Sequence, residues 1–256
     1  MNSFSEKKRA ILLFTRAPQH EARSKPLAAR LTFAERVGLY ASCLRHTLAQ
    51  ADALEVPIII ATDVPEYNFA QFAGTVELVI AQRGRAFGEK LGEALRQTFA
   101  QGYDEVVCIG SDCVELSPAD LRLAFAQIAQ HDIVLGAAKD GGVYLIGLRR
   151  EHAEQIYSLM HACHWQTAGV QRELLATARM NGLAVGLLRP CDEIDTFADL
   201  LRARALLRCV RFLKRYTGAL EKCFSSFFAQ FLPRAATLQC DPLRFQKAPP
   251  SVCACH

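Results

Sequence analysis

Short apolar runs alternate along the chain with segments in which apolar residues recur at helical spacing. A short run of apolar or β-branched residues bounded by polar residues is typical of a strand buried on both faces of a sheet. We therefore predict strands over residues 10–14, 56–62, 76–80, 105–109, 132–138, 143–148 and 184–188.

The segments between these runs predict helices. The residues Val37, Tyr40, Leu44 and Leu48 lie three or four positions apart and form one apolar face of a helix. Ser117 is a good N-cap and Pro118 suits a first helical position, so another helix begins there. The predicted helices span residues 33–50, 88–100 and 167–181, with others that begin at about 118 and 196.

This alternation of strands and helices predicts an α/β fold, in which helices cover both faces of a mostly parallel sheet. Residues 1–205 are predicted to form one such domain. Ligands of these sheets bind beyond the carboxyl ends of the strands, so the candidate functional residues are those that directly follow a strand.

The C-terminal part of the chain has a different pattern. Apolar residues from Leu206 to Phe231 follow a 4-3 spacing among basic side chains, which predicts an amphipathic helical extension over residues 206–232. Such a helix is suited to docking on the domain, to pairing in a homodimer or to lying on an anionic membrane surface. After Pro233 the periodicity ends, and residues 233–256 are predicted to form a loose tail.

Charge and cysteine placement narrow the class of protein. The net charge of +4 over 256 residues is small, which argues against a dedicated nucleic-acid-binding protein. The apolar run after Arg9 is too short for a signal peptide, and no stretch approaches the ~20 apolar residues of a transmembrane helix. Cys43, Cys108 and Cys209 lie within apolar segments, where free cysteine behaves as a small hydrophobic residue. We expect a cytoplasmic protein with reduced cysteines.

Several common enzyme motifs are absent from the sequence. The chain has no Gly-x-Gly-x-x-Gly, which disfavours a dinucleotide-binding enzyme, and no Gly-x-Ser-x-Gly, the usual hydrolase elbow. Residues 84–90 superficially resemble a P-loop, but the spacing is one residue short and no Ser or Thr follows the lysine.

Carboxylates follow two of the predicted strands. Asp112 comes after the strand over residues 105–109 and could hold the Mg²⁺ or Mn²⁺ of a nucleotide diphosphate, since these hard cations prefer oxygen ligands. A turn aspartate that bonds nearby amides is the alternative, which composition alone slightly favours. Asp195 ends the acidic run 192–195 and is the second candidate metal ligand, although acids beside a helix start at Thr196 are also expected as capping residues.

A glycine pair lies between two of the predicted strands. Asp140 is followed by Gly141 and Gly142, which would allow the backbone to approach a ligand closely. The residues alone favour an ordinary hairpin turn at this place, because Asp-Gly is the usual signal for one.

Basic residues follow the first predicted strand. Arg16, Arg23 and Lys25 lie in a loop that often binds phosphates in α/β sheets. Solvated surface charge accounts for these residues equally well.

Six segments of the chain, taken in order, resemble a known family. The segments are 13–18, Gln82 with 87–91, 109–113, 140–148, Trp165 and 193–196. Each motif is weak alone, but the ordered set is fairly specific and covers roughly the first 205 residues. It resembles the bacterial GT-A-like glycosyltransferases that are linked with radical-SAM partners and arsenosugar biosynthesis. That family is more distantly similar to the molybdenum-cofactor guanylyltransferases.

The resemblance implies a three-layer GT-A-like domain and a role for individual residues. It implies that Asp112 and Asp195 hold Mg²⁺ or Mn²⁺, and that Asp112, Asp140 and Asp195 are catalytic. The implied nucleotide- and phosphate-binding residues are Arg16, Ala17, Pro18, Arg23, Lys25, Gln82, Gly88 and Ser111. The implied acceptor side comprises Gly141, Gly142, Tyr144 and Trp165.

The chain departs from the family's pattern at three places. In residues 20–27 the basic residues are displaced, and Pro26 stands where the family has an arginine. Lys139 replaces an acid, and Gln166 replaces a serine. We predict metal-assisted transfer of a sugar from a nucleotide-diphosphate sugar to a small acceptor. The alternatives are a nucleotidyltransferase that uses an NTP and a non-catalytic scaffold with a degenerate nucleotide site.

Overall fold

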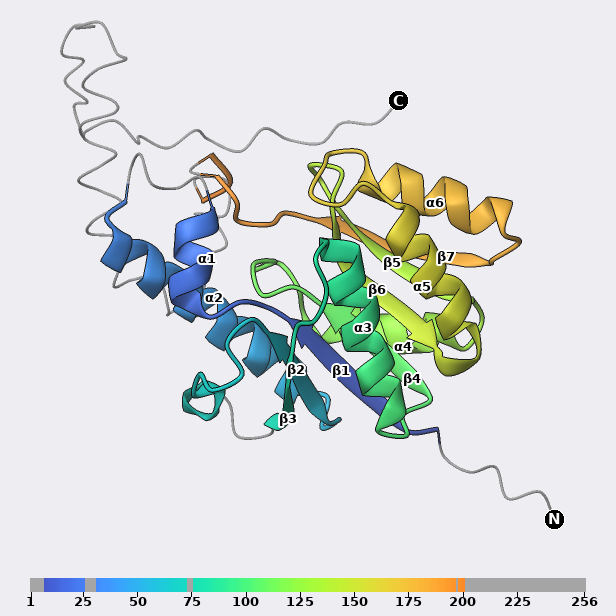
Figure 1. Cartoon of the computed structure of the whole chain (residues 1–256), viewed down its shortest axis with the longest axis horizontal. Coiled ribbons are helices and arrows are strands. Elements are labelled where there is room, and N and C mark those ends of the chain that lie inside the picture. Colours follow the sequence, from blue (N-terminus) through green and yellow to red (C-terminus); the bar gives the residue numbers. More distant parts are fainter. Residues whose placement is uncertain (1–6, 26–30, 73–75, 197, 201–256) are drawn as a thin grey trace, which may run out of the picture. The chain divides into compact units, whose positions relative to one another are not determined.

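One mixed sheet organises the part of the chain that the computed structural model describes, residues 7–25, 31–72, 76–196 and 198–200. Its strand order is β3-β2-β1-β4-β6-β5-β7 (Figure 1). Only β6 runs antiparallel to its neighbours β4 and β5 among these strands. The strands are β1 Arg9–Phe14, β2 Ile58–Thr62, β3 Val76–Ala81, β4 Glu105–Ile109, β5 Ile133–Ala138, β6 Val143–Arg149 and β7 Val185–Cys191.

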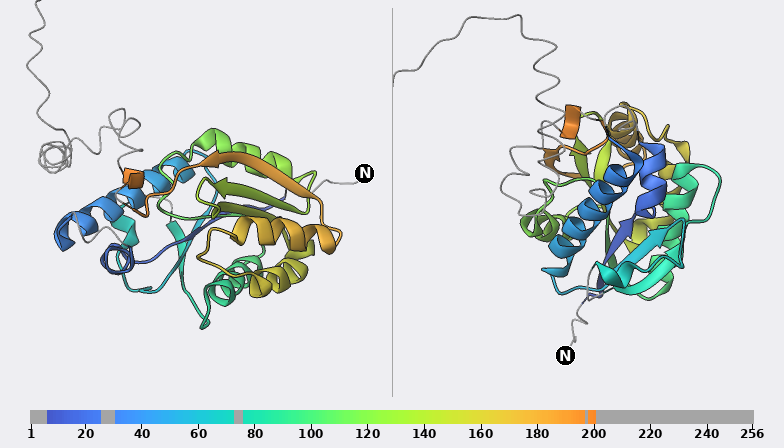
Figure 2. Two further views of the ribbon diagram at one scale, coloured as in Figure 1. Left: turned by 90° about the horizontal axis from the view of Figure 1, so that it is seen from above. Right: turned by 90° about the vertical axis from the view of Figure 1, so that its left-hand side faces the viewer.

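Helices cover both faces of the sheet, so the predicted α/β fold is confirmed. The helices α3, α5 and α6 cover one face, and α2 and α4 cover the other (Figure 2). The α-helices are α1 Pro18–Ser24, α2 Phe33–Asp52, α3 Phe87–Ala100, α4 Pro118–Ile128, α5 Ala153–Ala162 and α6 Val170–Met180. Two 3₁₀ turns, η1 Phe69–Gln71 and η2 Arg150–His152, complete the described elements.

The central strands are apolar because both of their faces are covered. Every residue of β2, β4 and β5 is buried. A strand in this position needs apolar side chains on both faces, which is why the sequence shows continuous apolar runs instead of alternation. All the predicted strands are found, with ends that differ by a few residues.

Two helices were missed by the sequence pattern. The first loop contains α1, which is mostly polar and buries only Pro18 and Ala22. The segment after β6 contains α5, whose apolar residues lie against α3. The predicted helix over residues 167–181 begins later, at Val170, because Thr167 and Gly169 form a turn in which the Thr167 hydroxyl accepts from the Gly169 amide.

The start of α4 is fixed as predicted. Ser117 caps the helix, and the Asp120 carboxylate accepts hydrogen bonds in return from the amide and the hydroxyl of Ser117. Arg189 on β7 also donates to both Asp120 oxygens, at 2.8 and 2.7 Å. Burial alone would raise the pKa of Asp120, but the hydrogen bonds from Arg189 and Ser117 outweigh it and lower the pKa below 3.8. The pair ties α4 to β7.

We expect Asp120→Asn to lower the free energy of unfolding by about 2 kcal/mol at neutral pH. The folded carboxylate has the lower pKa, so its contribution is present above the unfolded pKa of about 3.9 and is lost as the pH falls below it. Urea unfolding of both proteins at neutral and at acid pH should therefore show a difference in unfolding free energy that shrinks as the pH falls. Glu66→Gln on the exposed loop after β2 is the control, and an equal loss at both pH values would contradict the ion-pair interpretation.

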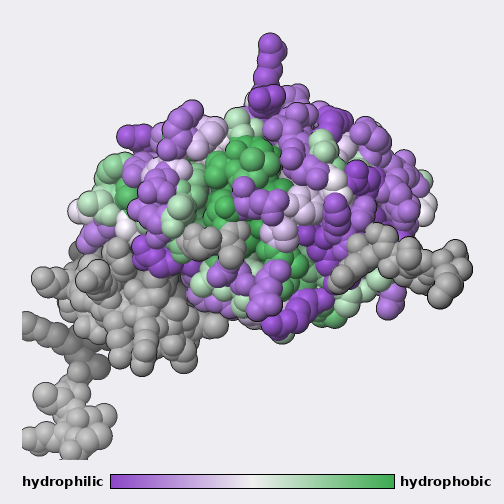
Figure 3. All heavy atoms as spheres, turned by 90° about the horizontal axis from the view of Figure 1, so that it is seen from below, coloured by the Kyte–Doolittle hydropathy of each residue, from purple (hydrophilic) through white to green (hydrophobic). Residues whose placement is uncertain are grey.

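Other predictions concern the surface and the C-terminal region. In the part of the chain with described coordinates, no helix is long and apolar enough to cross a membrane. Hydrophilic side chains surround a central hydrophobic area on the face seen from below (Figure 3). The predicted extension over residues 206–232 and the tail over 233–256 lie outside the described residues.

Candidate functional site

The predicted functional segments meet at one edge of the sheet. The strands β1, β4, β5 and β7 run in the same direction, so their carboxyl ends lie at this edge. The hairpin that joins β5 to antiparallel β6 turns at the same edge. The loops after β1, β4, β5 and β7 therefore surround a common space, as the rule for such sheets predicts.

Lys25 joins the acids of two of these loops. Its ammonium donates to Asp112 Oδ2 and Asp195 Oδ1, and it lies 3.5 Å from Glu21 Oε1. The Lys25 side chain is only 17% exposed. Glu21 and Lys25 lie four residues apart at the end of α1, a spacing that places both on the same side of the helix. The structure thus brings Asp112 and Asp195 together around one cation.

The carboxylates keep Lys25 charged. Burial opposes a charge on its side chain, but the attraction of Asp112, Asp195 and Glu21 outweighs burial and raises the pKa of Lys25. Burial raises the pKa of Glu21 and of Asp195, while Lys25 acts in the opposite direction on both. This cluster therefore favours a positive charge.

Glu193 lies beside this cluster and was treated in the sequence only as part of an acidic run. Its carboxylate has no hydrogen bond or ion pair to any described residue. It lies near Gly142, where an added Cβ would be 3.3 Å from Oε2, and near Gly110, where the distance to Oε1 would be 3.9 Å. Burial, followed by repulsion from Asp112 and Asp195, raises the pKa of Glu193 well above its usual value.

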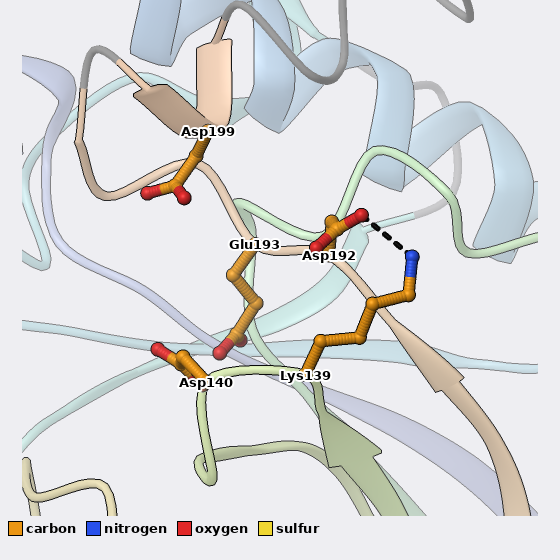
Figure 4. A pocket seen from close by; sticks show the side chains of 5 residues that line it. All are labelled: Lys139, Asp140, Asp192, Glu193 and Asp199. Carbon is orange, nitrogen blue, oxygen red and sulfur yellow. Dashed lines mark hydrogen bonds and ion pairs between the residues drawn. The ribbon is translucent and has the colours of Figure 1, made fainter.

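A cavity of about 370 Å³ opens next to Glu193. It is lined by Lys139, Asp140, Asp192, Glu193 and Asp199. The Glu193 carboxylate points toward Asp140, whereas Lys139 points away to Asp192 (Figure 4). Lys139 lies 2.6 Å from Asp192 and 3.5 Å from Glu115.

The acidic residues after β7 have different hydrogen-bond partners. The acidic capping residue expected near Thr196 is Asp199, whose carboxylate accepts from the amide and the hydroxyl of Thr196. Asp195 places its own carboxylate on Lys25 instead. The backbone amide of Ile194 donates to the Asp112 carbonyl at 3.1 Å, which holds the loops after β4 and β7 side by side.

Several of the proposed phosphate-binding residues have partners within the protein. The Ala17 amide donates to Asp63 Oδ1 at 3.0 Å. The Gln82 side chain donates to the carbonyls of Thr15 and Ala61, at 2.9 and 3.1 Å. The Ser111 hydroxyl lies 2.8 Å from that of Thr15. These contacts join the loops after the strands.

The three basic residues of the first loop lie in different surroundings. Lys25 lies in the carboxylate cluster, Arg23 stacks over the ring of Phe33 at 5.4 Å, and Arg16 is half-buried near Glu21. The pattern did not reveal that His20 of this loop pairs with Asp63, 2.7 Å away. Only Lys25 of the three contacts both candidate metal ligands.

Gly88 and Trp165 have a packing role in the structure. The Trp165 indole donates to the Met160 carbonyl at 2.6 Å and packs on Phe87. A Cβ at Gly88 would lie 2.3 Å from the Met160 carbonyl oxygen, so the start of α3 needs glycine to admit this contact. Neither residue lines the described cavity.

The hairpin interpretation of the glycine pair is confirmed, and Tyr144 beside it lies in the core. Asp140, Gly141 and Gly142 form the turn between antiparallel β5 and β6. Tyr144 is 1% exposed in the core, where its hydroxyl donates to the Arg189 carbonyl at 2.9 Å. It does not reach the cavity, because alternate residues of a strand point to opposite faces.

The fold is that of the nucleotide-diphospho-sugar transferases. A crystal structure from Desulfovibrio desulfuricans G20, provisionally described as a nucleotide-diphospho-sugar transferase, is 25% identical, with a TM-score of 0.73. The match covers 88% of this chain and 99% of that one. The similarity indicates a transferase of the nucleotide-binding kind.

Residues 43–165, just under half of the chain, match a family described as uncharacterized protein conserved in bacteria (DUF2064). No curated protein matches the chain.

Two nucleotidyltransferases share the fold at low sequence identity. The 4-diphosphocytidyl-2C-methyl-D-erythritol synthase from Anaerococcus prevotii DSM 20548 is 12% identical with a TM-score of 0.54, over 79% of this chain and 96% of that one. A CMP:2-keto-3-deoxy-manno-octonic acid synthetase, complexed with CTP, is 14% identical with a TM-score of 0.51, over 79% and 99%.

Proposed function

We propose that the protein transfers a sugar from a nucleotide-diphosphate sugar to a small acceptor, with a divalent cation at the donor site. The observation that carries this proposal is the convergence of Asp112 and Asp195 on one cation at the carboxyl edge of the sheet. The similarity to the transferase from Desulfovibrio desulfuricans G20 supports the donor class. The link with arsenosugar biosynthesis stays a prediction from the sequence.

The donor set suits Mg²⁺ or Mn²⁺. Asp112 and Asp195 offer hard oxygen ligands, and Lys25 shows that a positive charge fits between them. Among the described residues, no group of three or more His, Cys, Asp or Glu side chains is arranged to hold a metal alone. Two carboxylates are nevertheless sufficient for Mg²⁺ when substrate phosphates supply further ligands. The cation, when bound, stabilises the charge that develops on the leaving diphosphate.

The residues of the chain would then act in sequence. Lys25 releases the two carboxylates as the donor binds, and its ammonium pairs with the diphosphate. Asp112 and Asp195 would hold the cation, which would help to orient the donor diphosphate. The acceptor hydroxyl forms a bond to the sugar carbon, the bond from that carbon to the diphosphate oxygen breaks, and the hydroxyl proton leaves for a nearby base.

The test is thermal unfolding of the full chain with a panel of nucleotide sugars and NTPs, with and without Mn²⁺. A ligand at about 100 times its Kd stabilises the folded state by about 2.7 kcal/mol, so the donor that binds is revealed by its shift. We expect a shift with a nucleotide sugar that depends on Mn²⁺.

The other outcomes distinguish the alternatives. A shift with an NTP alone, followed by pyrophosphate release, would indicate a nucleotidyltransferase instead. If no member of the panel shifted the Tm of a folded sample, the protein would instead be a non-catalytic scaffold.

A further inference from the structure

We propose that the cavity beside the donor site binds an acceptor that carries a protonated amine, with the ammonium between Asp140 and Glu193. The role of this molecule as acceptor rests on the proposed function, whereas its binding does not. The cavity is the 370 Å³ space lined by Lys139, Asp140, Asp192, Glu193 and Asp199. That volume is within the usual range for small-molecule pockets.

The charges of the lining favour a cation. Four acidic side chains and one ammonium line the cavity, so acidic groups outnumber the basic one. The single ammonium, on Lys139, is already engaged by Asp192 and by Glu115. Asp199 serves the start of a helix at Thr196. The carboxylates of Asp140 and Glu193 are the ones that face each other across the space (Figure 4).

Glu193 supplies an independent sign of a ligand. Its side chain is half-buried beside the cavity, yet its carboxylate accepts no hydrogen bond from the described part of the chain. Buried polar groups are nearly always paired, because an unpaired one costs the free energy of its lost hydration. Gly142 leaves room beside it, because a Cβ at this position would lie only 3.3 Å from the carboxylate. A hydrogen-bond donor from outside the chain would complete this site.

A protonated amine suits this geometry better than a neutral hydroxyl does. It presents three donors and a positive charge, and hydrogen bonds between charged groups are about twice as strong as neutral ones. Asp140 keeps one oxygen for the Gly142 amide, at 2.9 Å, which holds its carboxylate in place. The other oxygen remains for a ligand. The candidate metal ligands, Asp112 and Asp195, are by contrast joined to Lys25.

Calorimetric titration of the full chain with glucosamine, glucose and N-acetylglucosamine tests this proposal. The three sugars are matched, and only glucosamine carries an ammonium at about pH 6.5. We expect glucosamine to bind at least about 10-fold more tightly than either neutral sugar, with an affinity that falls as salt rises. Asp140→Asn and Glu193→Gln should each remove this preference.

Asp112→Asn separates the proposal from the donor-site function. We expect this variant to lose Mn²⁺-dependent nucleotide binding and to keep its preference for glucosamine. Equal or tighter binding of glucose, or no heat with glucosamine up to about 10 mM, would overturn the proposal. So would competition between Mn²⁺ and glucosamine that disappears in Asp112→Asn, because the amine would then occupy the metal position.

Discussion

Replacing Asp112 by asparagine should lower kcat/KM for the nucleotide-sugar donor by about 10³-fold, which corresponds to roughly 4 kcal/mol of transition-state stabilisation. The substitution preserves the shape of the side chain and removes one of the two carboxylates on which the cation site depends. Initial rates with the donor identified by thermal unfolding measure the effect. Stability should change little, because the change also removes one charge from a crowded group of acids.

The control for this experiment lies beside the same strand, β4. Asp104 precedes β4, at the opposite end from Asp112, and accepts a hydrogen bond from the Lys8 amide that asparagine can also accept. Asp104→Asn should leave turnover unchanged. If Asp112→Asn retained the activity of the wild type, neither the metal nor the proposed donor site would be tenable.

Replacing Gly141 by alanine should destabilise the protein by about 3 kcal/mol, a change of about 10 °C in Tm for a chain of this size. Gly141 has a φ of +96°, which disfavours any other residue, and an added Cβ would lie 2.0 Å from the Ala168 carbonyl oxygen. Its own carbonyl accepts from the Gln171 amide at 3.1 Å, so the hairpin and the start of α6 cannot separate without loss. Thermal and urea unfolding measure the effect.

Gly102→Ala separates the two causes of this loss. Gly102 has a similar φ of +100°, but nothing lies within 4 Å of an added Cβ. The backbone conformation alone should cost about 1 kcal/mol, so Gly102→Ala should be much milder. Equal losses for the two variants would show that the contact with Ala168 contributes nothing.

The sequence was sufficient to predict the sheet because the central strands are buried on both faces. In a chain of this composition, short continuous apolar runs such as those of β2 and β4 are typical of strands at the centre of a covered sheet. The capping residues of α4 and of the segment after Thr196 also act locally and could be predicted. By contrast, α1 is short and polar, and it is held by Asp63, a residue distant in sequence.

The sequence predicted the two aspartates of the site but not the residues that surround them. Strand ends identified Asp112 and Asp195, since the topology of the sheet decides what lies at its carboxyl edge. No local pattern shows that Lys25 contacts both of them or that Glu193 lacks a partner, because these depend on three loops meeting in space. Tyr144 lies next to the hairpin in sequence, but its side chain points into the core.

The segment after β7 contributes to two neighbouring places in the structure. Asp192 and Glu193 line the cavity, while Asp195, two residues later, pairs with Lys25. A substitution in this segment will therefore be felt at both places, and we expect the segment to tolerate few changes.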